Sequence, residues 1–423
     1  MWQQARHGFA VILLILSFAV IGCSGSRETD VIAYVIAMGI DKSEKEAGQF
    51  DFTFQIAVPR SLAAGGQSTK LEESQFFITI TAVNLADARN KINTVISRPP
   101  TWAHTKIILF GESMARSGIK DFLSPTFRWR EFRGSIYLAV VHNGSAKELM
   151  EKNRPILEQN LSRWYETVLI YDKEPALYIK TQLHDVYKQL KSDSASPYIT
   201  LIAFNQQPDT AKDAGKVPPS KSYEFTAGNL IYESKDTKVE IAGTALFFAD
   251  KMVGILTTDE TRALQILKGT LLRSFVIVED PLVPQKAVNA EIRLDKQPKI
   301  QANLVDGEPV FYITVDLEGE ITSIPSGINY ENEEYSRLLE DRISDVIYRQ
   351  INNMLVKTQE AGCDAVGFGY KIRRLFWTYP EFQQLGWQRL YPKSKFVINV
   401  DTKIRRTGLM LKTNPIADDS QKE

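Results

Sequence analysis

The chain has 423 residues, of which 43% are hydrophobic and 24% charged, proportions typical of a globular protein with a substantial core. At roughly 100–200 residues per domain, this length predicts two or three domains. The 51 basic and 51 acidic residues cancel, so the charge indicates neither nucleic-acid binding nor a long charged tail.

The first 22 residues predict an export signal. Arg6 and His7 precede an apolar run, and Gly8–Gly22 spans about 15 residues, whereas a membrane-spanning helix needs roughly 20. The run ends in Val20-Ile21-Gly22-Cys23, which resembles the lipobox of bacterial lipoproteins. In those proteins the cysteine sulfur receives a diacylglyceryl group, and the chain is cut just before it. An ordinary signal with an incidental cysteine is the alternative.

Cys23 is therefore the predicted lipidation site, because the thiolate is the nucleophile that such acylation needs. The predicted membrane anchor is a diacylglyceryl group together with an N-acyl chain on Cys23, and two acyl chains already bury enough methylene groups for stable anchoring. Everything after Cys23 then becomes an extracytoplasmic domain on a lipid tether. The second cysteine, Cys363, lies among apolar residues, and we expect a buried side chain more than a reactive thiol. No disulfide is expected, so the fold must depend on core burial.

The first half of the chain alternates irregularly between strand and helix patterns. This irregularity favours an α+β fold over a doubly wound sheet. The predicted strands are Val31–Asp41, Phe50–Val58, Gln75–Thr81, Lys106–Phe110 and Ser135–Val141. The predicted helices begin at Asn84, at Gly111 (ending at Phe122) and at Ser145, and Ser61–Ser74 reads as a loop.

A polar segment with three prolines, residues 206–222, is the predicted linker between domains. It separates an N-terminal α+β domain, 23–205, which is either one unit or two lobes, from a C-terminal α+β domain, 223–415. Residues 416–423 are a polar tail. We expect successive domains with mixed or antiparallel sheets and packed helices.

The second half is predicted to be a sheet crossed by a long helix. Apolar residues recur at three- and four-residue spacing over about Asn332–Lys357, which indicates one continuous buried stripe. Thr257 and Glu260 have the spacing of a capping box for a helix that ends at Leu267. The predicted strands are Tyr223–Tyr232, Val239–Ala249, Leu271–Val278, Ala287–Leu294, Lys299–Leu304, Val310–Leu317 and Lys395–Arg406.

No catalytic or cofactor motif stands out. His104, His142 and His184 lack metal-ligand spacing, and no phosphate-binding loop or nucleophile elbow occurs. We therefore predict no enzyme activity, no cofactor and no metal. An exported hydrolase whose carboxylates meet only in the fold is the weakest alternative.

Several stretches, in order, are similar to the C-subunit family of spore-germination nutrient receptors, the Ger(x)C lipoproteins. They are the lipobox with Arg27-Glu28, Ala37–Lys42, His104–Glu112, Gly243–Phe248, Val253–Leu256, Glu260-Thr261-Arg262, Gln359, Asp364, Gly367-Phe368-Gly369, Trp387 and Arg405–Gly408. The family usually has Trp-Asp after the cysteine, where this chain has Ser24-Gly25. Gly367-Phe368-Gly369 reads as a structural turn.

The resemblance implies an α+β, non-enzymatic subunit on the outer face of the spore inner membrane. It would act with a membrane-embedded A subunit and a transporter-like B subunit in nutrient sensing. The alternative is an extracytoplasmic solute-binding lipoprotein that holds a small molecule in a cleft between its domains.

Candidate interaction residues lie in one region of the first half. Lys106 stands between apolar strand residues, which indicates a buried ion pair or a partner contact. Trp102 and Phe132 are expected to pack in the core. Exposed aromatic side chains and arginine are favoured interface anchors, and our candidates are His104, Lys106, Trp129 and Arg133.

Overall fold

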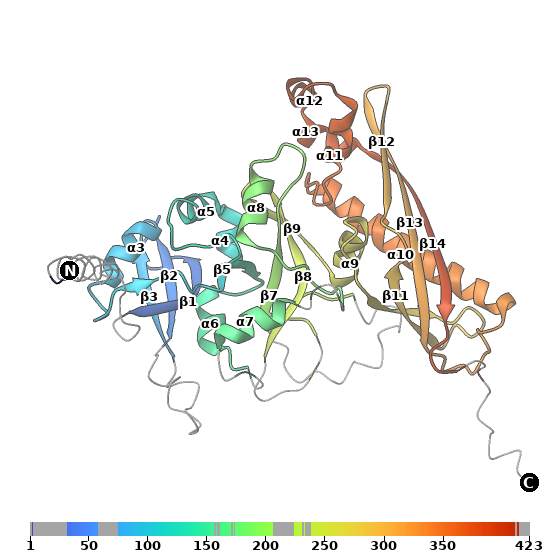
Figure 1. The fold of residues 1–423 in the computed structure, drawn as a ribbon, viewed down its shortest axis with the longest axis horizontal. Coiled ribbons are helices and arrows are strands. Elements are labelled where there is room, and N and C mark those ends of the chain that lie inside the picture. The colour runs from blue at the N-terminus through green and yellow to red at the C-terminus, as the bar shows by residue number, and fades with distance from the viewer. Residues whose placement is uncertain are drawn as a thin grey trace, which may run out of the picture.

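The computed structural model describes residues 2, 32–57, 75–155, 158, 161–170, 172, 174–205, 224–230, 232, 238–410 and 413. Within this part of the chain, two β-sheets lie side by side with helices packed against them, as Figure 1 shows. The predicted α+β class is confirmed. Cys23, the Ser61–Ser74 loop, the 206–222 linker and the 416–423 tail fall outside the described residues.

The first sheet is mixed. Among the described residues its strand order is β3-β2-β1-β5-β6-β7-β8-β9, with the short β4 beside the start of β1. Its central strands β1, β5, β6 and β7 are parallel, and the flanking strands pair antiparallel. The bounds are β1 (Ala33–Lys42), β2 (Phe50–Ala57), β3 (Gln75–Ala82), β4 (Pro100–Thr101), β5 (Ile107–Gly111), β6 (Tyr137–Val141), β7 (Tyr198–Phe204), β8 (Val239–Phe248) and β9 (Lys251–Leu256).

Helices bury both faces of this sheet. One face packs against α3 (Leu85–Ile92), α4 (Glu112–Ser117), α5 (Lys120–Thr126) and α8 (Leu183–Leu190). The other packs against α6 (Ala146–Lys152) and α7 (Leu161–Ile170). Because both faces are covered, the central parallel strands are almost continuously apolar rather than alternating.

The second sheet curls around a long helix. Its strand order in the described residues is β10-β11-β13-β12, and β14 pairs in parallel with β13. The helix α10 (Glu333–Glu360) buries a stripe at helical spacing that includes Leu339, Ile343 and Ile347, as predicted. The strand bounds are β10 (Ser274–Glu279), β11 (Ala287–Leu294), β12 (Lys299–Val305), β13 (Glu308–Ser323) and β14 (Lys395–Arg406).

The helix α9 (Thr258–Leu267) joins the two sheets. Thr257 and Glu260 form the predicted capping box, and every residue of α9 except Asp259 is buried. A single apolar cluster runs from Leu246 of the first sheet, through α9, to the second sheet and α10. The two sheets therefore share one core.

Between α10 and β14 the chain forms three short helices that sequence patterns did not predict. They are α11 (Gly369–Ile372), α12 (Tyr379–Leu385) and α13 (Trp387–Leu390). With their connecting segments, residues Gly369–Ser394, they stand out from the body at the top of Figure 1. We call this segment the projection.

Two element predictions were wrong. The single helix expected over Gly111–Phe122 breaks at Gly118, whose φ is +126°, and the N–H of Ile119 there donates to the carbonyl oxygen of Asp250. The strand expected at Tyr223–Tyr232 is not formed in its described part. Instead, the carboxylate of Glu240 accepts the N–H groups of Gly228 and Leu230 and holds a turn.

The first sheet takes strands from both sides of the predicted linker. β7 ends at Phe204 and pairs antiparallel with β8, which begins at Val239. The division of the chain into domains 23–205 and 223–415 stays a prediction.

Candidate functional site

Three of the four candidate interaction residues lie close together near the start of β1. The edge of the exposed His104 ring meets the ring of Tyr34, the second residue of β1, with centroids 5.0 Å apart. Partial desolvation, then the positive charges of Arg133 and Lys106, lower the pKa of His104, so its imidazole is neutral at pH 7. We call His104, Lys106 and Arg133 the His104 patch.

Lys106 has an ion-pair partner. Its Nζ lies 2.5 Å from Oε1 of Glu166 on α7, and both side chains are partly exposed. The sequence indicated a buried pair or a partner contact. The pair is present but not fully buried, and a partner contact stays a prediction.

Trp129 belongs to an aromatic cluster beside the patch. Its ring packs on Trp102, which is fully buried, with 6.3 Å between centroids, and on Phe132. The guanidinium of Arg89 lies 5.0 Å from the Trp102 ring and 4.9 Å from the Trp129 ring. Glu131 fixes this arrangement by accepting from Arg89 (2.7 Å) and from the N–H of Trp102 (2.9 Å). The expected core roles of Trp102 and Phe132 are confirmed.

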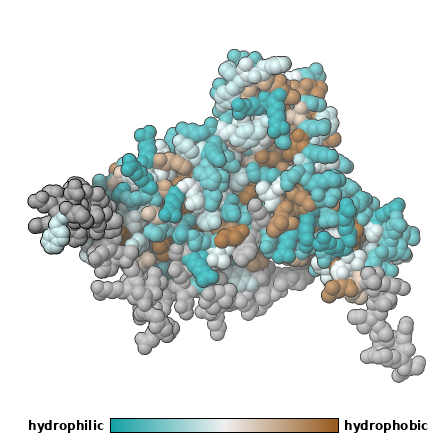
Figure 2. All heavy atoms as spheres, viewed as in Figure 1, coloured by the Kyte–Doolittle hydropathy of each residue, from teal (hydrophilic) through white to brown (hydrophobic). Residues whose placement is uncertain are grey.

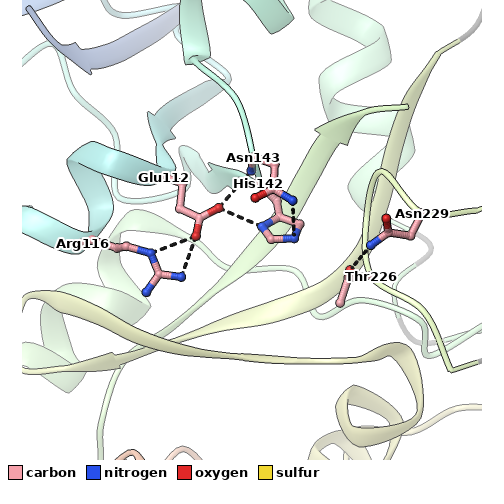
Figure 3. A network of polar contacts seen from close by, with 6 residues as sticks. All are labelled: Glu112, Arg116, His142, Asn143, Thr226 and Asn229. Atoms are coloured by element: carbon pink, nitrogen blue, oxygen red, sulfur yellow. Dashed lines mark hydrogen bonds and ion pairs between the residues drawn. The ribbon is translucent and has the colours of Figure 1, made fainter. Parts of the chain in front are cut away.

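A second polar group lies at the carboxyl ends of β5 and β6, where open sheets with parallel strands commonly bind ligands (Figure 3). The Glu112 carboxylate accepts from His142 Nδ1 (2.8 Å), from the N–H of Asn143 (2.9 Å) and from Arg116 (2.6 and 2.9 Å). Burial raises the pKa of Glu112, but these hydrogen bonds outweigh it, so the net pKa is lowered. Oε2 of Glu112 thus holds the loop after β6, while Oε1 pairs with Arg116 of the same helix, α4.

Asp41, at the carboxyl end of β1, has a similar role. Its carboxylate accepts the N–H groups of Ala146 (2.8 Å) and Lys147 (2.9 Å), the first residues of α6. These are donors that the helix itself cannot satisfy. Asp41 therefore ties the first strand to the start of α6.

Asp364 organises the Gly-Phe-Gly segment. Its fully buried carboxylate accepts the N–H groups of Gly367 (2.8 Å), Phe368 (2.9 Å) and Gly369 (2.8 Å), and the indole N–H of Trp387 (3.0 Å). Burial raises the pKa of Asp364, and the four donors oppose that rise. The structural role expected for Gly367-Phe368-Gly369 is confirmed.

The same segment contacts the first sheet. The backbone of Asp364 exchanges hydrogen bonds with Ser196, just before β7. Cys363 is buried beside Pro197, as predicted, and burial raises the pKa of its thiol to about 12. We call the contact between residues 194–197 and 363–369 the seam.

Sequence reasoning missed the roles of Asp41, Glu112 and Asp364. Two of these roles could have been suspected from the sequence, because Asp41 and Glu112 stand at or just after the ends of predicted buried strands. In the part of the chain that the structure describes, there is no cluster of three or more His, Cys, Asp or Glu residues suited to a metal ion. In the same part, no helix is long and apolar enough to cross a membrane.

Comparison with known proteins agrees with the resemblance seen in the sequence. Residues 25–204 match the model described as "Spore germination protein N-terminal domain", and residues 242–408 match "Spore germination B3/ GerAC like, C-terminal". The chain is 23% identical to spore germination protein KC of Bacillus subtilis, with 98% of each chain covered. It is also 23% identical to spore germination protein B3 of the same organism, covering 96% of this chain and 99% of that one.

A solved structure described as the GerBC protein shares the fold. Its TM-score is 0.51 at 20% sequence identity, and the match covers 87% of this chain and 97% of that one. The two domain models follow one another along almost the whole chain after Cys23, in the family's order. The protein therefore belongs to the GerAC, or Ger(x)C, family of spore germination proteins.

Proposed function

We propose that this protein is the lipid-anchored C subunit of a spore germinant receptor on the outer face of the spore inner membrane. It acts without catalysis, through contacts with the A and B membrane subunits. The observation that carries the proposal is the match to both family domains, in order, over residues 25–204 and 242–408.

The polar groups of the fold support an interaction role over a hydrolytic one. A general acid or base must reach a substrate with a carboxylate oxygen. The carboxylates of Asp41, Glu112 and Asp364 are instead occupied by N–H donors of neighbouring segments.

The His104 patch is the proposed contact site. Tyr34, which the His104 ring touches, lies about ten residues after Cys23. At 3.3–3.6 Å per extended residue, about ten residues reach no more than roughly 35 Å. A lipid on Cys23 would thus hold the patch near the membrane surface, within reach of membrane-embedded partners.

The anchor is tested by metabolic labelling with a fatty-acid analogue. We expect the wild-type chain and the control Cys363→Ala to incorporate the label, and Cys23→Ala to lose both the label and nutrient-triggered germination. Label retained in Cys23→Ala would contradict lipidation at Cys23.

The partner contact is tested by co-purification from solubilised spore membranes. We expect His104→Ala/Arg133→Ala to lower recovery of the A and B subunits several-fold. Arg337→Ala, a remote exposed position, should leave recovery unchanged. Recovery of unrelated proteins alone would argue against the receptor role. Heat released on titration with amino acids or sugars would favour the solute-binding alternative.

A further inference from the structure

The projection exposes aromatic and aliphatic side chains that a soluble surface normally covers. The side chain of Trp377 is 98% exposed, and Tyr370, Leu375 and Tyr379 near it are also exposed. All four come from one stretch of ten residues. Figure 2 shows pale and brown residues among hydrophilic ones over this part of the surface.

The same segment carries a local excess of positive charge. Residues 369–394 contain Lys371, Arg373, Arg374, Arg389 and Lys393, and a single acidic residue, in a chain whose charges cancel overall. That acidic residue, Glu381, is exposed, and one of its carboxylate oxygens accepts the N–H groups of the two residues that precede α12. Even with this residue counted, the segment carries a net charge of +4.

Two of these cations share a cavity with a third. Lys371 and Arg374 line a hollow of about 360 Å³ together with Lys268 at the end of α9. No Asp or Glu is among the described residues that line it. Lys268 instead lies 5.1 Å from the Tyr198 ring, and Arg373 lies 4.8 Å from the Tyr379 ring.

We propose that the projection docks onto an anionic membrane surface, with Trp377 at the boundary of headgroups and acyl chains and with Lys268, Lys371 and Arg374 binding lipid phosphates. Trp and Tyr concentrate at that boundary, and basic side chains are attracted to anionic headgroups. A net charge of +4 beside a hollow that no described Asp or Glu lines fits an anionic lipid surface, which attracts clusters of basic residues. The docking rests on the proposed function only in that the lipid on Cys23 keeps the protein at the membrane.

The experiment uses the lipidated full chain reconstituted in vesicles whose acyl chains are brominated, because bromine quenches tryptophan fluorescence on contact. Vesicles are either neutral phosphatidylcholine or phosphatidylcholine with phosphatidylglycerol. We expect quenching in the anionic vesicles only, and we expect it to weaken with added salt. Trp377→Ala should lose most of the quenching.

Charge variants separate docking from a general charge effect. Lys371→Gln/Arg374→Gln should lower the quenching at least threefold in anionic vesicles. Lys152→Gln/Arg337→Gln removes the same charge from exposed, remote positions and should leave quenching unchanged.

Equal quenching in neutral and anionic vesicles, or in Trp377→Ala, would overturn the docking. So would a Trp377 that becomes shielded only when the A and B subunits are added, which would assign the projection to a protein partner. Flotation of the vesicles reports the anchor independently. Protein that floats without quenching refutes the docking and leaves the anchor intact.

Discussion

Three acidic residues with little exposure, Asp41, Glu112 and Asp364, each accept backbone N–H groups of a loop, a turn or a helix start. Asp41 and Glu112 reach segments distant in sequence, whereas Asp364 holds the turn that directly follows it. Together they accept six backbone N–H groups. A hydrogen bond to an ionised acceptor is stronger than one between neutral groups, and a buried donor without a partner is costly. Each of these three residues therefore contributes strong hydrogen bonds that stabilise a loop, a turn or a helix start.

Asp364→Ala should destabilise the protein strongly. The substitution leaves three backbone N–H groups and the Trp387 indole N–H without an acceptor in a buried site. At ~1–3 kcal/mol for each unsatisfied donor, the free energy of unfolding should fall by at least about 3 kcal/mol. Urea denaturation measures it, with the exposed Asp341→Ala as control. A loss as small as that of the control would show that water replaces the carboxylate.

Glu112→Gln should destabilise the protein in a pH-dependent way. The folded-state pKa of Glu112 is below its ordinary value of 4.5, so its stabilisation is present above that value and is lost as the pH falls through the folded-state pKa. The difference in unfolding free energy between wild type and Glu112→Gln should thus be largest near pH 7 and shrink below about pH 4. Denaturant titrations at several pH values measure it, with the exposed Glu334→Gln as control. A difference that does not vary with pH would contradict the assignment.

At the scale of elements, α10 shows how reliably a long apolar stripe predicts a helix. The expected range, about Asn332–Lys357, agrees with Glu333–Glu360, and the stripe faces the second sheet as predicted. The short helices α11–α13 show the opposite case. Each has only four to seven residues, too few for a repeating apolar stripe, and packing by Phe382, Trp387 and Tyr391 holds them.

Neighbouring positions of α10 should respond differently to truncation. Ile347 is fully buried against the second sheet, whereas Tyr348 beside it is exposed. Ile347→Ala should lower the free energy of unfolding by ~2–5 kcal/mol, because it removes core contacts and leaves a cavity. Tyr348→Ala should cost less than about 1 kcal/mol. Thermal or urea denaturation compares them, and equal losses would mean that α10 does not pack as described.

At the scale of the whole molecule, the seam and α9 connect the two sheets through a shared apolar cluster and hydrogen bonds. A Cβ on Gly369 would lie 2.5 Å from Trp387 Nε1 and 2.6 Å from the carbonyl oxygen of Ser194. Gly369→Ala should therefore force the seam apart and destabilise the protein by about 1–3 kcal/mol, as overpacking does. At Gly254 an added Cβ meets ordinary contacts at 3.6 Å or more, so Gly254→Ala is the control.

Calorimetry distinguishes the possible outcomes for Gly369→Ala. We expect one cooperative transition at a lower temperature if the shared core keeps the sheets coupled. Two separate transitions would mean that the seam alone couples them. A Tm equal to that of Gly254→Ala would contradict the close contact.

The sequence by itself determined the α+β class, the long helix α10, the capping box of α9, and strands β11 and β14 to the residue. These depend on periodicity and capping, which act between neighbours in the chain. It also determined the family, through short motifs in a constant order. Cys23 and the interaction residues remain sequence-based proposals.

Only the tertiary structure decided what the motif residues do and how the strands divide between sheets. Asp41 is hydrogen-bonded to α6, Asp364 is hydrogen-bonded to Ser196, and β7 pairs with β8. In each case folding brings together groups that are distant in the sequence, and no local sequence pattern links them. The first sheet therefore crosses the predicted linker, although composition changes there. Burial and hydrogen bonding between distant segments, rather than local preference, set the architecture that holds the His104 patch and the projection.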